Sequence, residues 1–461
     1  MPRWIPNESG EEAALLSELG LRDVEELFVD VPRRARIGRI GLGKGCSEPE
    51  VVQTIDKILG RNRAYTGFAN FLGGRIGIRH VPAAVDSILS RSEFYTSYTP
   101  YQSEASQGLL QALFEFQSLW VELSGLDVAN ASLYDGATAL GEAALFCQRI
   151  RHGSRFLIPA SLPWEEKSVL QNYLAGLPVR LEEIPYDPSS GLLKLDAVRE
   201  KIRGADVFGL LADLPNGFGL VDSGLLELKS VLGDVPLVVS ADPLALTVLA
   251  APGEYGADVV VGEGQGFGQP PSFGGPSLGL FACRREHMRF APGRIVGATR
   301  DADGRRAFTL TLQTREQHIR RSRATSNICT NESLLALGFV VYASLVGPRG
   351  LRALQLHLSE RARTLATALG RVEGLVAPRF DAPYLGEFTL ALRRGTLHVF
   401  LDRLRRRKVL GGVPLADPRP GAPQAEEELL LTAVAETTSD REIQRYATVA
   451  QQALRTLPEA A

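Results

Sequence analysis

The sequence predicts an α/β protein, with a mostly parallel sheet covered by helices and a small α+β C-terminal domain. Its 461 residues are enough for two or three folding units. Apolar residues make up 44% and charged residues 23%, which is typical of a globular chain. Between residues 155 and 283, short apolar runs alternate with amphipathic runs, and this alternation is the pattern of a parallel sheet with helical crossovers.

The predicted elements fall into three regions. Residues 1–65 combine short helical signals, at 11–19 and 23–28, with turn-rich sequence at 36–50, and predict an N-terminal arm. Residues 66–330 predict the large α/β domain, with a long helix from residue 103 to Gly125, strands near 155, 207, 236, 258 and 278, and helices at 136–150, 164–177, 195–203 and 223–233. Residues 331–461 predict the small domain, with helices at 332–346 and 349–370 and strands over EFTLAL and LLLTAV.

Charge, cysteine spacing and hydropathy exclude several classes of protein. The formal net charge of -2 argues against a nucleic-acid partner. The four cysteines lie far apart with no C-x-x-C pair, so we expect neither a metal site nor a disulfide framework. The opening segment carries acidic residues where a signal peptide carries basic ones, and the longest apolar segment, 332–349, is short for a membrane span. We therefore expect a cytoplasmic protein without a membrane partner.

The segment YDGATA, at residues 134–139, places a turn and a threonine at the start of a predicted helix. Free backbone N–H groups and the positive end of the helix dipole favour an anion there, and Thr138 could add a hydroxyl donor for a phosphate group. An ordinary helix cap explains the same residues. Both interpretations of Thr138 stay open.

Asp242, in the segment SADP, follows the apolar strand PLVV. It lies where open α/β folds bind ligands, at the carboxyl edge of the sheet. An acid at this place can keep the pyridine nitrogen of a cofactor protonated, which turns the ring into an electron sink. The alternative is a turn aspartate before a proline.

The loop GEGQGFGQPPSFGGP, at residues 262–276, follows the predicted strand DVVVG. Its glycines do not fit the G-x-G-x-x-G fingerprint of dinucleotide-binding proteins. The loop resembles the one that follows a strand in aspartate-aminotransferase-like enzymes using pyridoxal phosphate (PLP), where a lysine forms the internal aldimine. The corresponding residue of this chain is Gln265.

The scarcity of lysine makes this substitution informative. The 51 basic residues include only seven lysines, and none lies between Lys229 and Lys408. A lysine that held such a cofactor would be expected in that interval, after Asp242. A carboxamide cannot condense with an aldehyde. The sequence therefore predicts either an inactive site or a site completed by a partner.

Three further segments have side chains that could take part in catalysis or binding, and each also has a purely structural interpretation. The phenols of YTSYTPYQ, among them Tyr98 and Tyr101, could stack on rings or transfer protons, but core or interface packing is the alternative. His80 is by itself more typical of a structural residue than of a catalytic one. The arginines of residues 314–331 could bind carboxylates or phosphates, or form a charged segment before the last domain.

Together these segments resemble the glycine decarboxylase family, the P-proteins of the glycine cleavage system, and in particular the alpha chains of its split form. The resemblance runs from about residue 10 to about residue 455. It is carried by FLGGRIGIRHVPAAV, EFYTSYTPYQSEASQGLLQALFEFQ, ANASLYDGATALGEA, ADPLAL, GADVVVGEGQGFGQPPSFGGPSLG, GRIVGATRDADGRRAFTLTLQTREQHIRR and ATSNICTN.

The resemblance implies a PLP-dependent fold type I and an α2β2 assembly with a beta subunit that carries PLP on its own lysine. No PLP is then expected covalently on this chain, and Thr138 and Asp242 would be remnants of an ancestral cofactor pocket. Tyr98 and Tyr101 match family tyrosines that reach the partner's cofactor, and His80 is a further candidate at that interface. The implied reaction decarboxylates glycine and passes the aminomethyl group to the lipoyl arm of the H-protein.

The chain departs from the family pattern in two places. The pattern near Gly73 usually reads GGG and later HH, whereas this chain has Arg75 and then Arg79 before His80. An alpha chain usually has an asparagine-containing run before PN-x-x-G, whereas this chain has Asp213 and Leu214. These departures bear on contacts to glycine or to the lipoyl arm.

Two other functions stay open. The first is a stand-alone PLP-dependent lyase that uses an unexpected lysine such as Lys229. The second is a non-catalytic subunit that only stabilises its partner.

Overall fold

The computed structural model of this chain describes residues 9–37, 41–62, 64–96, 98–203, 206–417 and 427–455. The start of the opening segment, residues 1–8, lies outside the described residues. The chain divides into two units, Met1–Tyr65 and Thr66–Ala461, which are described separately. The second unit holds both the expected large domain and the expected small one, so the boundary at 330 stays a prediction.

The described part of the first unit is largely helical. It contains α1 (Ser9–Glu18), the 3-10 helices η1 (Val24–Phe28) and η2 (Arg33–Ala35), and α2 (Glu48–Leu59). The first two helices lie where helical signals were expected. The expectation of turns up to residue 50 is wrong at its end, because α2 begins at Glu48. The Ser47 backbone N–H donates to the Glu50 carboxylate at 2.8 Å, which satisfies one donor at the helix start.

A seven-stranded sheet lies at the centre of the second unit, as far as its residues are described, with the strand order β2-β8-β7-β6-β5-β3-β4. The strands are β2 (Val128–Ala129), β3 (Arg155–Pro159), β4 (Arg180–Ile184), β5 (Val207–Leu214), β6 (Leu237–Ala241), β7 (Val259–Glu263) and β8 (Gly279–Cys283). The strands from β7 to β4 pair in parallel, whereas β8 pairs antiparallel with β7 and β2. The prediction of a mostly parallel sheet is confirmed, with all five expected strands present.

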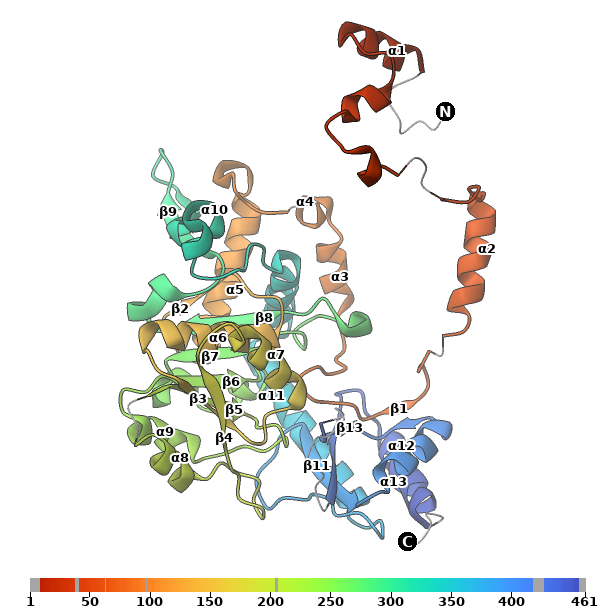
Figure 1. Ribbon diagram of the computed structural model, residues 1–461. Helices are drawn as coiled ribbons and strands as arrows, with labels where there is room; N and C mark the ends of the chain where they lie inside the picture. Colours follow the sequence, from red (N-terminus) through yellow and green to blue (C-terminus); the bar gives the residue numbers. More distant parts are fainter. Residues whose placement is uncertain are drawn as a thin grey trace. The chain divides into compact units, whose positions relative to one another are not determined.

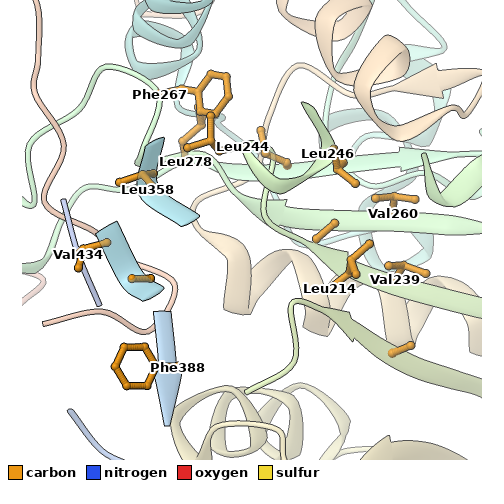
Figure 2. Packing of buried hydrophobic residues seen from close by; sticks show 14 of the residues in the cluster. Leu214, Val239, Leu244, Leu246, Val260, Phe267, Leu278, Leu358, Phe388 and Val434 are labelled. Carbon is orange, nitrogen blue, oxygen red and sulfur yellow. The ribbon is translucent and has the colours of Figure 1, made fainter. Parts of the chain in front are cut away.

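Helices cover both faces of this sheet (Figure 1). One core cluster includes residues of α5 (Gln107–Ser124), α8 (Leu195–Lys201) and α9 (Leu225–Leu232), and the other includes residues of α6 (Gly136–Ile150) and α7 (Trp164–Leu174). Side chains alternate along β6, where Val239 joins the first cluster and Val238 joins the second. Figure 2 shows Val239 beside Leu214 and Val260 in the first cluster.

The remaining elements of the large α/β part lie outside the seven-stranded sheet. They are β1 (Ala69–Asn70), α3 (Ala83–Leu89), α4 (Ser92–Tyr95), η3 (Ser103–Ala105), η4 (Ala245–Thr247), η5 (Pro252–Tyr255), η6 (Ser272–Gly274), η7 (Arg285–Phe290), β9 (Ile295–Arg300), β10 (Arg306–Thr311), η8 (Gln313–Arg315), α10 (Gln317–Arg320) and η9 (Arg321–Arg323). The antiparallel hairpin of β9 and β10 was not among the predicted elements. The predicted end of the long helix is confirmed, because α5 stops before Gly125, which adopts a left-handed φ of 69°.

The C-terminal part begins with α11 (Ser333–Leu369), which contains both helices expected there. Gly347 interrupts the helical conformation with φ 69° and ψ 168° just before Pro348. The elements that follow are β11 (Glu387–Arg393), α12 (Leu397–Arg406), β12 (Val409–Leu410), β13 (Val413–Pro414), β14 (Glu427–Ala433) and α13 (Asp440–Arg455). Strands β11, β14 and β13 form an antiparallel sheet, which gives this part the expected α+β character.

Among the described residues, α11 is the one helix with enough length and apolar composition to cross a membrane. The expectation of a segment too short for this is wrong, because the helix continues past Arg349. Its residues Ala336, Phe339 and Val340 lie in the core cluster that also contains residues of α5. Since core helices pass the same test, length and composition alone do not argue for a membrane span.

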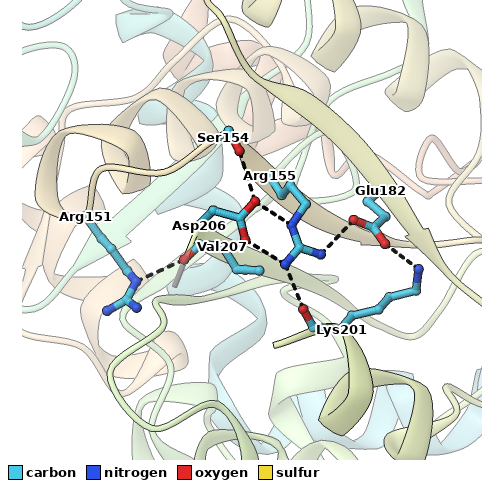
Figure 3. Close-up of polar contacts among 7 residues, drawn as sticks. All are labelled: Arg151, Ser154, Arg155, Glu182, Lys201, Asp206 and Val207. Carbon is cyan, nitrogen blue, oxygen red and sulfur yellow. Dashed lines mark hydrogen bonds and ion pairs between the residues drawn. The ribbon is translucent and has the colours of Figure 1, made fainter. Parts of the chain in front are cut away.

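Ion pairs join three strands at the amino edge of the sheet (Figure 3). Arg155, which begins β3, forms ion pairs with Asp206 at 2.7 Å and with Glu182 of β4 at 2.9 Å, and the Lys201 ammonium lies 2.5 Å from Glu182. Hydrogen bonds from the Arg155 guanidinium lower the pKa of Asp206 to about 2. Because its ammonium group pairs with Glu182, Lys201 has a structural role at this edge.

Replacing Leu210 with alanine should destabilise the second unit by about 2–5 kcal/mol, because the side chain is fully buried in β5 and its loss leaves a cavity. Urea unfolding followed by circular dichroism measures the change. Leu226→Ala is the control, since Leu226 of α9 is 58% exposed and should lose much less. Equal losses in the two variants would contradict the assignment of β5 to the core.

Candidate functional site

Three parallel strands bring acidic residues to one small cavity. β5, β6 and β7 run in the same direction, so their carboxyl ends meet at one edge of the sheet, where Asp213, Asp242 and Glu263 lie. Asp242 and Glu263 line a cavity of about 90 Å³, together with Arg75 and the start of α6. This edge is where the sequence predicted ligand binding.

The Glu263 carboxylate lies against the N-terminus of α6. It accepts hydrogen bonds from the backbone N–H groups of Gly136 at 3.0 Å, Gln265 at 2.8 Å and Leu278 at 3.2 Å, and from the Ser277 hydroxyl at 2.5 Å. A Cβ atom at Gly136 would lie 3.1 Å from that of Glu263, so a larger residue there would require a small shift of Glu263. The chain therefore places its own acid where the free N–H groups of a helix would attract a phosphate.

Burial and hydrogen bonding act in opposite directions on this acid. Burial raises the pKa of Glu263, whereas the hydrogen bonds from Ser277, Gly136, Gln265 and Leu278 lower it. Every donor that contacts the carboxylate is satisfied by it, so displacing Glu263 would leave three backbone N–H groups without this acceptor.

An ion-pair network centred on Arg75 forms another part of the cavity wall. The guanidinium lies 2.8 Å from Glu166 and 2.9 Å from Asp213, and Arg75 also donates to the Pro215 carbonyl at 3.3 Å. Two of the departures from the family pattern, Arg75 and Asp213, are thus bonded to each other although 138 residues separate them.

Burial controls the protonation of Asp213, whose side chain is fully enclosed. Burial raises the pKa of Asp213 to about 7; the Arg75 guanidinium opposes this rise and the nearby charge of Glu166 adds to it. The pKa of Arg75 is raised because both carboxylates outweigh its own burial. The network therefore holds one cation between two acids.

Gln265 points into the protein and does not line the cavity. Its side-chain oxygen accepts from the Gly77 N–H at 3.1 Å and its nitrogen donates to the Gln269 carbonyl at 2.6 Å. The residue is 1% exposed. The amide thus ties the loop after β7 to the segment that carries Arg75.

Thr138 and Asp242 both make local hydrogen bonds. Thr138 forms a capping box with Asp135, in which the Thr138 N–H donates to the Asp135 carboxylate at 2.7 Å and the Asp135 N–H donates to the threonine hydroxyl at 3.1 Å. The Asp242 carboxylate accepts from the Leu244 N–H at 2.9 Å. Asp242 lines the cavity and Thr138 does not. Their role as remnants of a cofactor pocket stays a prediction.

The tyrosines lie away from this cavity wall and are open to solvent. Tyr98 is 72% exposed and its hydroxyl is 3.0 Å from that of Thr330. Tyr101 is 54% exposed, and its hydroxyl accepts from Arg294 at 2.8 Å. The interpretation that these phenols pack in the core of this chain is therefore wrong. Their action on a partner stays a prediction. His80 is exposed, and its backbone N–H donates to Glu436 at 2.5 Å.

No lysine lines the cavity among the residues that the structure describes. Lys229 forms an ion pair with Asp258 at 2.8 Å. Asp258 precedes β7, whereas Glu263 ends it, so Lys229 lies at the opposite edge of the sheet, about 16 Å away by strand length.

Comparison with known proteins decides the family. The family model described as glycine cleavage system P-protein matches residues 2–393. The chain belongs to the P-protein family. A relative from Thermoplasma acidophilum, named probable glycine dehydrogenase (decarboxylating) subunit 1, is 42% identical over 405 residues, which are 88% of this chain and 91% of that protein.

Solved structures agree with this membership. The crystal structure of a glycine decarboxylase (P-protein) of the glycine cleavage system, in inhibitor-bound form, has a TM-score of 0.86 and 35% identity, and covers 98% of this chain and 99% of that one. A C-DES variant with glycine covalently linked to its PLP cofactor has a TM-score of 0.59 at 14% identity, covering 83% of this chain and 96% of its own, and shares only the fold. The PLP-dependent fold type I is confirmed.

The residues of this P-protein chain do not fit PLP in the cavity. The charged residues of its wall are two arginines and four acids, namely Arg75, Arg79, Glu166, Asp242, Glu263 and Glu387. Burial raises the pKa of Glu263 and of Glu387, and even with both neutral the wall has no excess of positive charge to attract a phosphate group. Glu263 occupies the start of α6, and Gln265 offers no amine for a covalent bond. In the described residues, no group of His, Cys, Asp and Glu is placed to hold a metal ion either.

Glu263 and the contact between Arg75 and Asp213 were not among the features predicted from the sequence. Glu263 could have been found by the reasoning that selected Asp242, because both acids follow apolar strands at the carboxyl edge of the sheet. The contact between Arg75 and Asp213 has no comparable local signal.

The wild-type protein should lose stability relative to Asp213→Asn as the pH rises from about 5 to about 8. The fold raises the pKa of Asp213 to about 7, so its contribution is fully present below the ordinary pKa and is lost as the pH rises through 7. Asparagine stays neutral throughout. The free energy of unfolding in urea, measured at both pH values, tests this.

Asp196→Asn is the control, because the Asp196 side chain is 95% exposed and should give a profile parallel to that of the wild type. A parallel profile for Asp213→Asn would contradict the raised pKa.

Proposed function

We propose that this chain is the PLP-free alpha subunit of a two-chain glycine decarboxylase in the glycine cleavage system. The observation that supports the proposal is the pair Glu263 and Gln265. The Glu263 carboxylate accepts from the first N–H group of α6, where a phosphate would be attracted, and Gln265 is the residue expected to correspond to the lysine. Membership of the P-protein family and relatives named subunit 1 support a second subunit that supplies the cofactor.

In this role the complex removes the carboxyl group of glycine as carbon dioxide and passes the aminomethyl group to the oxidised lipoyl arm of the H-protein. The assembly is α2β2, and the activity of the complex is that of glycine dehydrogenase (decarboxylating), in the cytoplasm. The partners of this chain are then the beta subunit, glycine and the lipoylated H-protein.

Tyr98 and Tyr101 are the residues of this chain that act at the beta subunit's site. Their exposure supports this role, because a phenol that reaches a partner cannot lie in its own core. The Tyr98 hydroxyl lies 3.0 Å from the Thr330 hydroxyl, and the Tyr101 hydroxyl lies 2.8 Å from the Arg294 guanidinium. These contacts give both side chains a defined orientation toward the partner. His80 is a third candidate, being exposed on the segment that also carries Arg75 and Arg79.

The stand-alone lyase is disfavoured by the position of Lys229 at the amino edge of the sheet, where Asp258 neutralises it. A purely stabilising subunit remains the second candidate function, because the buried amide and ion pairs of the cavity have structural roles.

Reconstitution distinguishes these functions. The purified chain, the cognate beta subunit and their mixture are each assayed for exchange of labelled carbon dioxide into the carboxyl group of glycine. We expect activity in the mixture far above that of either chain alone. Activity of this chain alone would contradict the proposal, and a beta subunit as active alone as in the mixture would indicate a stabilising subunit.

Tyr98→Phe should lower turnover of the reconstituted complex by a factor of about 10 or more, because it removes a positioned hydroxyl at the partner's site. Tyr95→Phe is the matched control, since Tyr95 is 68% exposed in the same segment and lies outside YTPYQ. Gel filtration checks that both variants still bind the beta subunit. Unchanged turnover in the Tyr98 variant would remove this residue from the site.

A further inference from the structure

A second cavity, of about 360 Å³, has a wall rich in arginine. It lies beside the last turn of α6 and the segment from η7 to η9. The arginines that line it are Arg149, Arg289, Arg315, Arg320 and Arg323, and no acidic residue belongs to its wall. The volume lies in the range of small-molecule sites, roughly 300–1000 Å³.

Among the residues that the structure describes, the arginines of this cavity have no carboxylate in direct contact with them. None of the five arginines forms an ion pair in the part of the chain that the structure describes. Glu316, the acid of the same segment, pairs with Arg294 at 3.4 Å and with His318 at 3.7 Å instead. The charges of Glu142 and Glu316 act on Arg149 and Arg315 and oppose the lowering of their pKa by burial. An anion in the cavity would still meet five guanidinium groups that form no ion pair within the described residues.

Arg315 and Arg149 are the least exposed arginines of the wall. Arg315 is buried and donates to the backbone carbonyls of Gly293 at 3.1 Å and Leu312 at 3.2 Å, and also to that of Ala291, so its position is fixed. Arg149 has one guanidinium nitrogen that is buried without a hydrogen-bond partner. Because an unsatisfied buried donor is costly, an acceptor on a bound ligand would remove this cost.

This arginine cavity is separate from the acidic cavity described above. Gly136 begins α6 in the acidic cavity, whereas Arg149 lies in the last turn of the same helix. At 1.5 Å per residue, the two ends are about 20 Å apart. The two cavities also have opposite charge, so they cannot bind the same part of one ligand.

We propose that the arginine cavity binds a small ligand with two linked phosphate groups. Guanidinium groups form bidentate, charge-assisted hydrogen bonds with phosphate, and five of them exceed what one monoanion would need. The enclosure of Arg149 and Arg315 favours a small ligand over the surface of another protein. Binding at this site can be measured on the isolated chain, so it does not depend on the role proposed in glycine decarboxylation.

Isothermal titration calorimetry of the full chain with pyrophosphate tests the proposal, with ADP as a second ligand and sodium sulfate at equal ionic strength as the control anion. Saturable binding of pyrophosphate, absent with sulfate, is expected. Tighter binding of ADP would assign the phosphates to a nucleotide, and equal binding would assign recognition to the phosphates alone.

The double variant Arg320→Gln, Arg323→Gln should weaken binding of pyrophosphate at least tenfold. Both residues are exposed, so the fold should be kept, and a melting curve checks this. Arg441→Gln, an exposed arginine of α13, is the matched control and should bind as the wild type does.

No saturable binding by the wild type at millimolar pyrophosphate would overturn the proposal, as would equal affinities of wild type and double variant. Loss of beta-subunit binding in the double variant, with no pyrophosphate bound by the wild type, would assign the cavity to an acidic protein surface instead.

Discussion

The carboxylate of Glu263 satisfies three backbone N–H groups and one hydroxyl at the place where α6 meets the carboxyl edge of the sheet. Free N–H groups at a helix N-terminus bind anions, so a carboxylate of the chain at this place competes with any anionic ligand for them. A phosphate would have to displace a group of the chain itself and would enter a wall with more acids than arginines. The chain thus has the PLP-dependent fold type I, and its own carboxylate lies at the N-terminus of α6.

Ion pairs and hydrogen bonds within the chain surround the cavity that Glu263 lines. Arg75 lies in a left-handed conformation, with φ 70°, in a segment of glycines, and its charge is matched by Glu166 and by Asp213. Gln265, at the position expected for a lysine, joins the loop after β7 to that same segment. These contacts connect the cavity residues to one another within the chain. In the proposed complex, the chemistry on glycine takes place on the beta subunit, and the exposed phenols of this chain contact it.

The strands and helices could be predicted from the sequence where the spacing of apolar residues is regular. The strands near 155, 207, 236, 258 and 278 and the helix over 136–150 follow from apolar runs and from turn residues between them. The start of α2 was missed although Ser47 and Glu50 have the spacing of a capping box, because the surrounding glycines suggested turns. In the site, Gln265 was found through the absence of lysine, whereas the contact of Arg75 with Asp213 depends on the tertiary structure. Exposure of Tyr98 and Tyr101 could not be predicted either, since an aromatic cluster is compatible with a core.

The location of the cofactor in the assembled enzyme tests this account most directly. The reconstituted complex is reduced with borohydride in the presence of PLP, the two chains are separated, and peptides carrying a pyridoxyl group are identified by mass spectrometry. We expect a modified lysine on the beta subunit and none on this chain. A stoichiometric pyridoxyl group on Lys229, or on any other lysine of this chain, would contradict it.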